Sequence, residues 1–243
     1  MSLNRIITVA GWSAPSEIMM PLARTIAKPE HIQHTSVSDL FAMQKTGVMS
    51  PYAEALSSVI NAGDTPATVI AWSMGAIVAL EAAVNADLNV DRIVLISSTT
   101  RFCSASDYPA GIPAVKIRAM QAALAISPRK TFQIFLSDSA HPGNITENIL
   151  NDRLNAALGF GMKILTHGLT YLRKTDLRDT AGSVAFPILA LHGRQDKIIP
   201  CAAAEQLADI IPSAKLAAFN NTGHDLPTQT PEALVPVIKE FLA

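Results

Sequence analysis

The feature that most constrains the fold of this chain is a series of short, almost wholly apolar segments that alternate with helical patterns. Apolar runs without polar alternation are typical of parallel strands buried on both faces of a sheet. Such strands are predicted at residues 5–10, 32–37, 67–72, 92–97, 187–192 and 215–219. Helices are predicted at residues 16–27, 51–61, 74–86, 202–211 and 231–242. The last has Thr230 as its N-cap and Pro231 at its first position. This alternation predicts an α/β fold with a doubly wound parallel sheet.

The segment 100–183 interrupts the alternation, because it contains no convincing strand pattern. Helical patterns instead cover residues 115–126, 131–136 and 148–157. An insertion of this length between two strands is too long for a plain loop. We therefore predict an α/β core made of residues 1–99 and 184–243, and a helical cap made of residues 100–183 over one end of the sheet.

Charge is distributed unevenly between these two parts. The whole chain has 19 Lys and Arg against 20 Asp and Glu, a net charge of −1, which gives no support to nucleic-acid binding. The cap alone has ten basic and six acidic residues, a net charge of +4. That excess is typical either of an ordinary solvated helix surface or of a docking face for an acidic partner.

The compartment is predicted from two further features. No apolar run approaches the roughly 18 residues of a membrane span, and the short apolar run near the start is better explained by a buried strand than by a signal peptide. Cys103 and Cys201 are far apart and unclustered, as is usual for free thiols in a reducing compartment. We expect a cytoplasmic, monomeric protein that does not associate with a membrane.

A candidate nucleophile lies where the predicted strand 67–72 meets the following helix. The sequence A-W-S-M-G at residues 71–75 is a variant of the G-x-S-x-G nucleophile elbow, with Ala71 in place of the first glycine. Small residues are needed two positions before and two positions after the serine, because bulky side chains there would clash with the strained turn. The turn would expose the Ser73 hydroxyl and aim the Met74 N–H at developing negative charge.

A serine hydroxyl needs a base, and the base needs an orienting acid. His224 follows the last predicted strand, and Asp196 lies just past the strand before it. Both would therefore reach the carboxyl edge of the sheet, where Ser73 also lies. The chain order Ser73, Asp196, His224 is the order of the α/β-hydrolase triad. The sequence thus predicts a Ser-His-Asp triad for acyl transfer.

The loop after the first predicted strand is expected to supply a second oxyanion donor. Gly11 lets the backbone approach closely, so the Trp12 N–H would join the Met74 N–H in an oxyanion hole. The Trp12 indole either walls the acyl pocket or packs as a core aromatic. No G-x-G-x-x-G or P-loop is present, and the sequence predicts no metal, nucleotide or flavin. The histidines that lack metal-ligand spacing are His31, His34, His141 and His167, while His192 is interpreted as a packing residue.

The same segments resemble a known family. Gly-Trp at residues 11–12, Trp-Ser-Met-Gly at 72–75, Thr-Asp-Leu-Arg at 175–178, the Asp196 loop and Gly-His at 223–224 are similar to those of the pimeloyl-ACP methyl ester carboxylesterases of biotin synthesis. The similarity covers nearly the whole chain. It implies an α/β-hydrolase fold and a serine esterase that hydrolyses the methyl ester of pimeloyl-ACP, where ACP is the acyl carrier protein, to pimeloyl-ACP and methanol.

The resemblance also implies roles for cap residues. Phe135 would line the acyl channel, and Lys130 would stand at a basic position that binds the acidic carrier. A further family arginine position is occupied here by Ile134, which leaves Arg129 or Arg153 to compensate. The chain starts almost directly at the first strand, without an N-terminal antiparallel hairpin, so we predict about six parallel strands.

The triad alone does not identify the substrate. A generalist short-chain carboxylesterase, a lactonase and a C–C bond hydrolase would carry the same three residues. A non-enzymatic ligand receptor on this fold is a further alternative, but it would leave the triad without a purpose.

Overall fold

A six-stranded sheet runs through the computed structural model, which describes residues 5–43, 49–85 and 87–243. The strand order is β2-β1-β3-β4-β5-β6, and every neighbouring pair is parallel. The strands are β1 (Arg5–Ala10), β2 (Ile32–Ser36), β3 (Ala67–Trp72), β4 (Val90–Ile96), β5 (Ile188–Gly193) and β6 (Ala214–Phe219). The predicted parallel α/β sheet of six strands is confirmed, and β1 and β3 have the predicted bounds.

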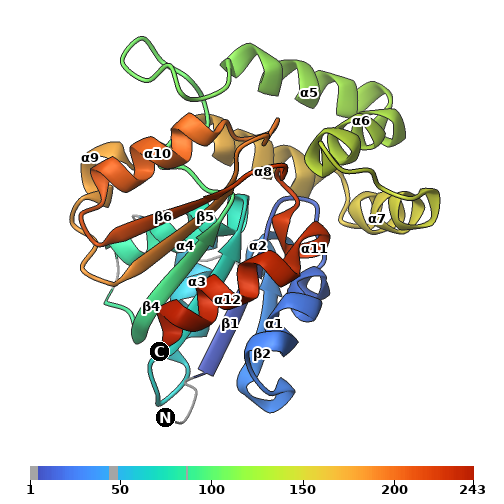
Figure 1. Ribbon diagram of the computed structural model, residues 1–243. Helices are drawn as coiled ribbons and strands as arrows, with labels where there is room; N and C mark the ends of the chain where they lie inside the picture. Colours follow the sequence, from blue (N-terminus) through green and yellow to red (C-terminus); the bar gives the residue numbers. More distant parts are fainter. Residues whose placement is uncertain (1–4, 44–48, 86) are drawn as a thin grey trace.

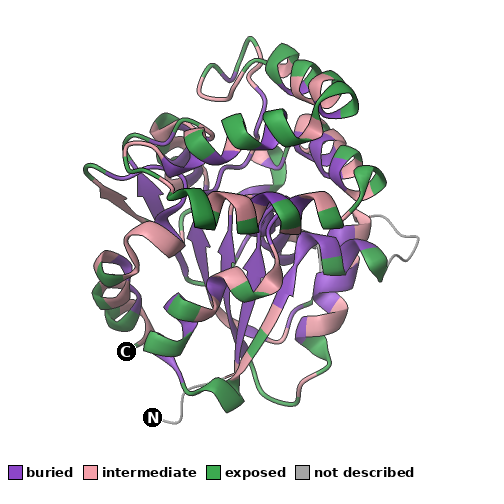
Figure 2. Ribbon diagram, turned by 90° about the vertical axis from the view of Figure 1, so that its right-hand side faces the viewer, coloured by how far each residue is buried: buried purple, intermediate pink, exposed green. Residues whose placement is uncertain are grey.

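Helices cover both faces of the sheet (Figure 1). Apolar residues on opposite faces of strands such as β1, β3 and β4 belong to two separate hydrophobic clusters, as the pleat requires. One cluster packs against α1 (Met20–Ile26), α11 (Leu226–Gln229) and α12 (Pro231–Leu242). The other packs against α2 (Val37–Ala42), α3 (Pro51–Asn61), α4 (Met74–Asn85), α9 (Arg178–Ala181) and α10 (Cys201–Ile210). Figure 2 shows the result as buried strands beneath helices with exposed outer faces.

The boundaries of several predicted elements need correction. The predicted strand 32–37 ends at Ser36, because the Ser36 side chain and Asp39 form a reciprocal capping box that starts α2. The predicted helix 16–27 is divided into a 3-10 helix η1 (Ser16–Met19) and α1, since Pro21 has no N–H and fits a first turn. The other strand ends move by one or two residues.

The two C-terminal helix predictions also differ in detail from the structure. Helix α10 begins and ends one residue before the predicted 202–211. Helix α12 has the predicted bounds, but the Thr230 hydroxyl donates to the Leu226 carbonyl instead of capping the helix. Ala86, the last residue of the predicted helix 74–86, lies outside the described residues, as do residues 1–4 of the predicted core.

Four helices of about equal length lie between β4 and β5, grouped over one end of the sheet (Figure 1). They are α5 (Ala114–Ile126), α6 (Pro128–Ala140), α7 (Glu147–Gly159) and α8 (Met162–Lys174). Helix α8 was not predicted, and α6 is longer than the predicted 131–136. Isolated β-bridges, such as Arg101 with Asp176, lie at the base of this group.

Two remaining sequence features have simple outcomes. Cys103 is buried, Cys201 is half-buried, and both are free thiols. Within the described part of the chain, no helix is both long enough and apolar enough to cross a membrane.

Candidate active site

Ser73 lies on a tight turn between β3 and α4. Its φ of 57° is in the left-handed region, which is strained for a residue with a side chain. The turn is held by the Ser73 N–H, which donates to the Ile96 carbonyl at 2.9 Å. Close neighbours leave no space for side chains at two glycines: a Cβ on Gly11 would lie 2.8 Å from Ser73 Cβ, and a Cβ on Gly75 would lie 2.8 Å from the Ala10 carbonyl oxygen. The glycines therefore allow the β1 loop to approach Ser73.

The structure brings Ser73, His224 and Asp196 into one hydrogen-bonded series. His224 Nε2 lies 2.8 Å from Ser73 Oγ, and His224 Nδ1 lies 2.8 Å from Asp196 Oδ2. His224 and Asp196 are buried, whereas Ser73 is half-buried. Because a carboxylate only accepts, Nδ1 carries the proton, and Nε2 is left to accept the proton of the serine. Each residue follows a strand of the parallel sheet, so all three lie at the same edge.

Asp196 is itself held from two sides. Its Oδ1 accepts hydrogen bonds from the Ile198 N–H at 2.7 Å and the Ile199 N–H at 2.8 Å, which turns Oδ2 toward His224. On the other side, His192 Nε2 lies 2.9 Å from the Ile199 carbonyl oxygen and 3.3 Å from Asp196 Oδ2. The carbonyl can only accept, so Nε2 is protonated. Burial lowers the pKa of His192, which favours the neutral form of this second histidine.

Hydrogen bonds hold the main chain of His224 in place as well as its imidazole ring. The Trp72 indole N–H and the Ser97 hydroxyl both donate to the His224 carbonyl oxygen, each at 2.9 Å. Trp72 directly precedes Ser73, so one residue connects the serine turn to the histidine loop. The tryptophan before the nucleophile was noted in the sequence, but this role could not be predicted because the two residues are 152 positions apart.

Two backbone N–H groups beside Ser73 are free to donate to a ligand. Met74 directly follows Ser73. Trp12 directly follows Gly11, and Gly11 packs against Ser73. Neither N–H donates to any acceptor among the described residues. The Trp12 indole N–H donates to the Leu165 carbonyl of α8 at 2.9 Å, and its ring stacks on Phe132 at 5.2 Å. Trp12 thus joins the β1 loop to the helices above it.

Ser73 lies at the junction of two cavities of very unequal size. The larger has a volume of about 410 Å³ and is lined mainly by apolar residues of α5, α6 and α8, with Lys116, Asp138 and Lys197 as its charged residues. The smaller has a volume of about 20 Å³, close to the space that one water molecule needs. Trp12 and Phe135 line both cavities, so the structure places Phe135 beside the serine.

The three basic cap residues that were expected to bind a carrier have different positions. Arg129 and Lys130 are exposed in the first turn of α6, and Arg129 donates to Asn151 Oδ1 at 2.8 Å. Arg153 instead forms an ion pair with the buried Asp225 and lines the smaller cavity. Arg153 therefore has an acidic partner within the protein, and its role toward a carrier stays a prediction.

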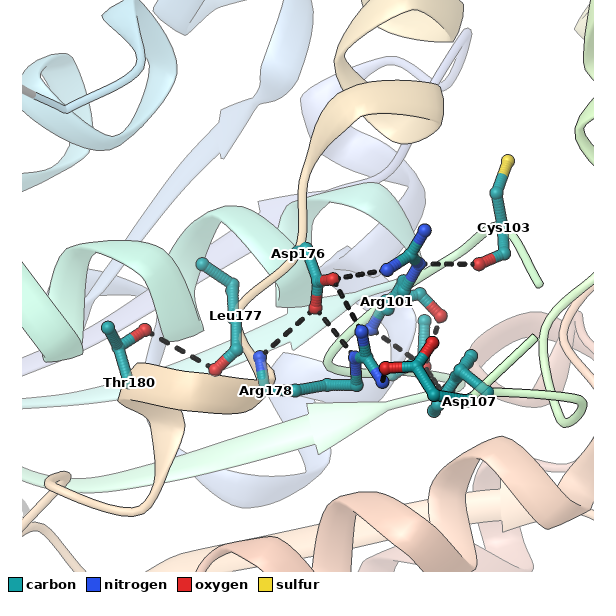
Figure 3. Close-up of polar contacts among 9 residues, drawn as sticks. Arg101, Cys103, Asp107, Asp176, Leu177, Arg178 and Thr180 are labelled. Atoms are coloured by element: carbon teal, nitrogen blue, oxygen red, sulfur yellow. Dashed lines mark hydrogen bonds and ion pairs between the residues drawn. The ribbon is translucent and has the colours of Figure 1, made fainter. Parts of the chain in front are cut away.

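A second ion-pair cluster closes the base of the cap (Figure 3). Arg101, where the chain enters the cap, pairs with Asp176, where the chain leaves it. Arg178 contacts both Asp176 and Asp107, each at 2.9 Å. Hydrogen bonds from Arg178 lower the pKa of both carboxyl groups. Asp176 and Arg178 belong to the Thr-Asp-Leu-Arg segment singled out in the sequence. This segment thus joins the point where the chain enters the cap to the point where it leaves the cap.

Sequence reasoning missed the residues that hold the histidine loop. Asp225 and Arg153 are 72 positions apart, and no local pattern relates them. The only available signal was the acidic residue directly after His224. Ser97 and His192 lie at the ends of predicted strands, the same location that identified Asp196.

The sequence is similar to those of known proteins. The family model described as the alpha/beta hydrolase family matches residues 33–237. A pimeloyl-[acyl-carrier protein] methyl ester esterase from Aromatoleum aromaticum is 32% identical, over 72% of this chain and 74% of that protein. An esterase of the same name from Xanthomonas axonopodis pv. citri is 28% identical, over 90% of this chain and 87% of that protein.

Solved structures show the same fold. An esterase from Exiguobacterium antarcticum has a TM-score of 0.85 at 18% identity, covering 100% of this chain and 93% of its own. A bromoperoxidase from Bacillus anthracis has a TM-score of 0.86 at 15% identity, covering 98% of this chain and 92% of its own. At these identities the likeness concerns the fold alone.

Proposed function

This chain belongs to the alpha/beta hydrolase family and is a carboxylic ester hydrolase, and from this premise we propose that it hydrolyses the methyl ester of pimeloyl-ACP to pimeloyl-ACP and methanol. The reaction would serve biotin synthesis in the cytoplasm. The relatives named above supply the substrate class. The observation that carries the proposal is the position of Ser73 between a large apolar cavity and a very small one.

The two cavities match the two parts of a long-chain methyl ester. The cavity of about 20 Å³ is close to the space that one water molecule needs, which suits a group as small as the methyl of a methyl ester. The cavity of about 410 Å³ has space for an extended acyl chain. The five methylenes of a pimeloyl chain would contribute at most about 4 kcal/mol of binding free energy at roughly 0.8 kcal/mol each. This contribution favours long acyl chains but discriminates poorly between neighbouring lengths.

The hydrogen-bonded series supports nucleophilic catalysis. His224 accepts the Ser73 proton as the hydroxyl attacks the ester carbonyl, and Asp196 holds the imidazole in the required tautomer. The free N–H groups of Met74 and Trp12 stabilise the tetrahedral oxyanion, and one such donor is worth about 10²–10³ in rate. His224 then protonates departing methanol. In the second half-reaction it activates water, which releases the acyl group from Ser73.

Genetic complementation tests this proposal. The wild-type gene should restore growth without biotin to a strain that lacks its own esterase of this kind, whereas a Ser73→Ala variant produced at the same level should not. Failure of the well-expressed wild type to restore growth would favour a generalist esterase, a lactonase or a C–C bond hydrolase. Rates on methyl pimeloyl-ACP, dimethyl pimelate, a lactone and a diketone would then identify the preferred class.

Carrier docking through the exposed basic residues of α6 gives a separate prediction. Lys130→Glu should lower kcat/KM for methyl pimeloyl-ACP about tenfold, because it replaces attraction to an acidic carrier by repulsion. The same variant should hydrolyse dimethyl pimelate, which lacks the carrier, within about twofold of the wild-type rate.

Steady-state rates on both esters, at low and at high salt, measure this effect. Added salt should weaken the wild-type preference for the carrier-linked ester, because exposed charges are screened. Lys239→Glu, at an exposed lysine of α12, is the matched control and should leave both rates unchanged. Equal losses of Lys130→Glu on the two esters would contradict docking at this position.

A further inference from the structure

The Arg153–Asp225 ion pair joins a cap helix to the loop that carries the proposed base. Arg153 lies on α7, and Asp225 directly follows His224. The Asp225 side chain is 1% exposed and that of Arg153 is 16% exposed, so water screens the pair only weakly. Arg153 also donates to Thr228 Oγ1 at 2.7 Å. The guanidinium therefore holds both ends of the segment 225–228.

Other contacts from the same side restrain the histidine loop. The Asp225 N–H donates to the Ser139 carbonyl of α6 at 3.1 Å. A Cβ at Gly223 would collide with the His141 carbonyl, so the loop packs directly on the main chain that leaves α6. The residues on both sides of His224 are thus fixed by cap segments, while His224 itself reaches across to Ser73.

The charge of Asp225 is balanced by Arg153 in particular. Asp225 Oδ2 is the oxygen that pairs with Arg153, and Asp225 Oδ1 is buried without a hydrogen-bond partner in the described structure. Loss of the guanidinium would leave a buried carboxylate uncompensated one residue from the imidazole. Loss of the carboxylate would instead leave an unmatched cation beside the smaller cavity.

We infer that Arg153 and Asp225 are positioning residues for the proposed ester hydrolysis: as a neutral pair they hold His224 in register with Ser73 and keep its surroundings electrically balanced. Neither residue needs to touch the reacting atoms. The inference rests on the proposed function. It adds to that function a residue pair that acts whether or not a carrier protein is bound. It also predicts that a small ester depends on this pair as strongly as a carrier-linked ester does.

Other charged and titratable groups near His224 also affect the pH dependence of kcat/KM. They are Asp196 and His192, whose pKa is lowered by burial, from the β5 side, and the Lys197–Asp138 pair, 3.8 Å apart, at the larger cavity. Both variants described below leave these groups unchanged. The pH dependence of kcat/KM gives the pKa of the essential base in the free enzyme. A change in the charges around the imidazole therefore shifts this dependence.

Two near-isosteric variants, Arg153→Met and Asp225→Asn, test the inference on dimethyl pimelate. Both should lower kcat/KM by about tenfold to a hundredfold through misplacement of His224, with most of the loss in kcat. Their pH profiles should move in opposite directions. The acidic limb is the low-pH side of the profile, where kcat/KM falls as His224 is protonated. Its midpoint should move up by about half a pH unit in Arg153→Met, where an unbalanced anion stabilises the imidazolium, and down by about as much in Asp225→Asn.

Three controls separate this role from general destabilisation. Arg153→Lys keeps the charge and should keep the wild-type acidic limb even if Arg153→Met fails to fold. Asp176→Asn, which weakens the ion-pair cluster at the base of the cap, should lower stability without moving the limb. Lys239→Glu, at an exposed lysine of α12, should leave hydrolysis of dimethyl pimelate unchanged.

The outcomes distinguish the inference from the function on which it rests. Opposite shifts of the acidic limb support the inference. Shifts in the same direction, no shift in Asp225→Asn, or the same shift in Asp176→Asn would overturn it. Wild-type protein that does not hydrolyse dimethyl pimelate or methyl pimeloyl-ACP would instead contradict the proposed function.

Discussion

Replacing Ser73 by alanine should lower kcat by roughly six orders of magnitude and leave the fold intact. The hydroxyl is the atom that His224 Nε2 faces at 2.8 Å, and no acyl-enzyme can form without it. The side chain is half-buried on a strained turn, so removing Oγ opens no cavity in the core. A loss of stability is therefore not expected to accompany the loss of activity.

Methanol release from dimethyl pimelate measures the activity, and thermal unfolding measures the fold. A fluorophosphonate probe should label one site in the wild type and none in Ser73→Ala. Ser137→Ala, at an exposed serine of α6, is the matched control and should retain wild-type activity and labelling. Substantial turnover or labelling by Ser73→Ala would show that another residue is the nucleophile.

The second large effect is expected at Asp196. Its Oδ1 accepts two backbone N–H groups, from Ile198 and Ile199. In Asp196→Asn the amide carbonyl must take that position, so the NH₂ group points at His224 Nδ1. Two donors cannot face each other, and the imidazole must adopt the tautomer with its proton on Nε2. That tautomer cannot accept the serine proton, and kcat should fall by about 10⁴.

This loss should occur without a change in global structure, which circular dichroism and thermal unfolding can verify. Asp209→Asn, at an exposed residue of α10, is the control and should match the wild type. An Asp196→Asn variant that keeps a tenth or more of wild-type kcat would contradict the assigned orientation of the acid.

Elements whose pattern is complete within a few residues could be predicted from the sequence. Strand β3 is buried at all six positions, so its continuous apolar run identifies it without tertiary information. Helix α12 begins at a proline that fixes its first turn. Helix α8 was missed although its buried Leu165, Leu169 and Leu172 have helical spacing, because polar residues dilute the apolar pattern between them.

The site divides in the same way. Ser73, Asp196 and His224 could be brought together from sequence because each follows a parallel strand, and parallel strands end at one edge. The contacts of the histidine loop with Trp72 and Arg153 depend instead on how side chains pack between the cap and the sheet. The ion pair of Arg153 could not be predicted for the same reason, since its basic character says nothing about a buried acidic partner.

The larger cavity has a consequence for how this protein could diversify. Its α5 wall, which includes Lys116, Met120 and Ala123, takes part in none of the hydrogen bonds that connect the serine, the histidine and the aspartate. Substitutions there can lengthen, shorten or polarise the chamber without disturbing the atoms that break the ester bond. The range of substrates can therefore change through the α5 wall while the residues that cleave the ester stay the same.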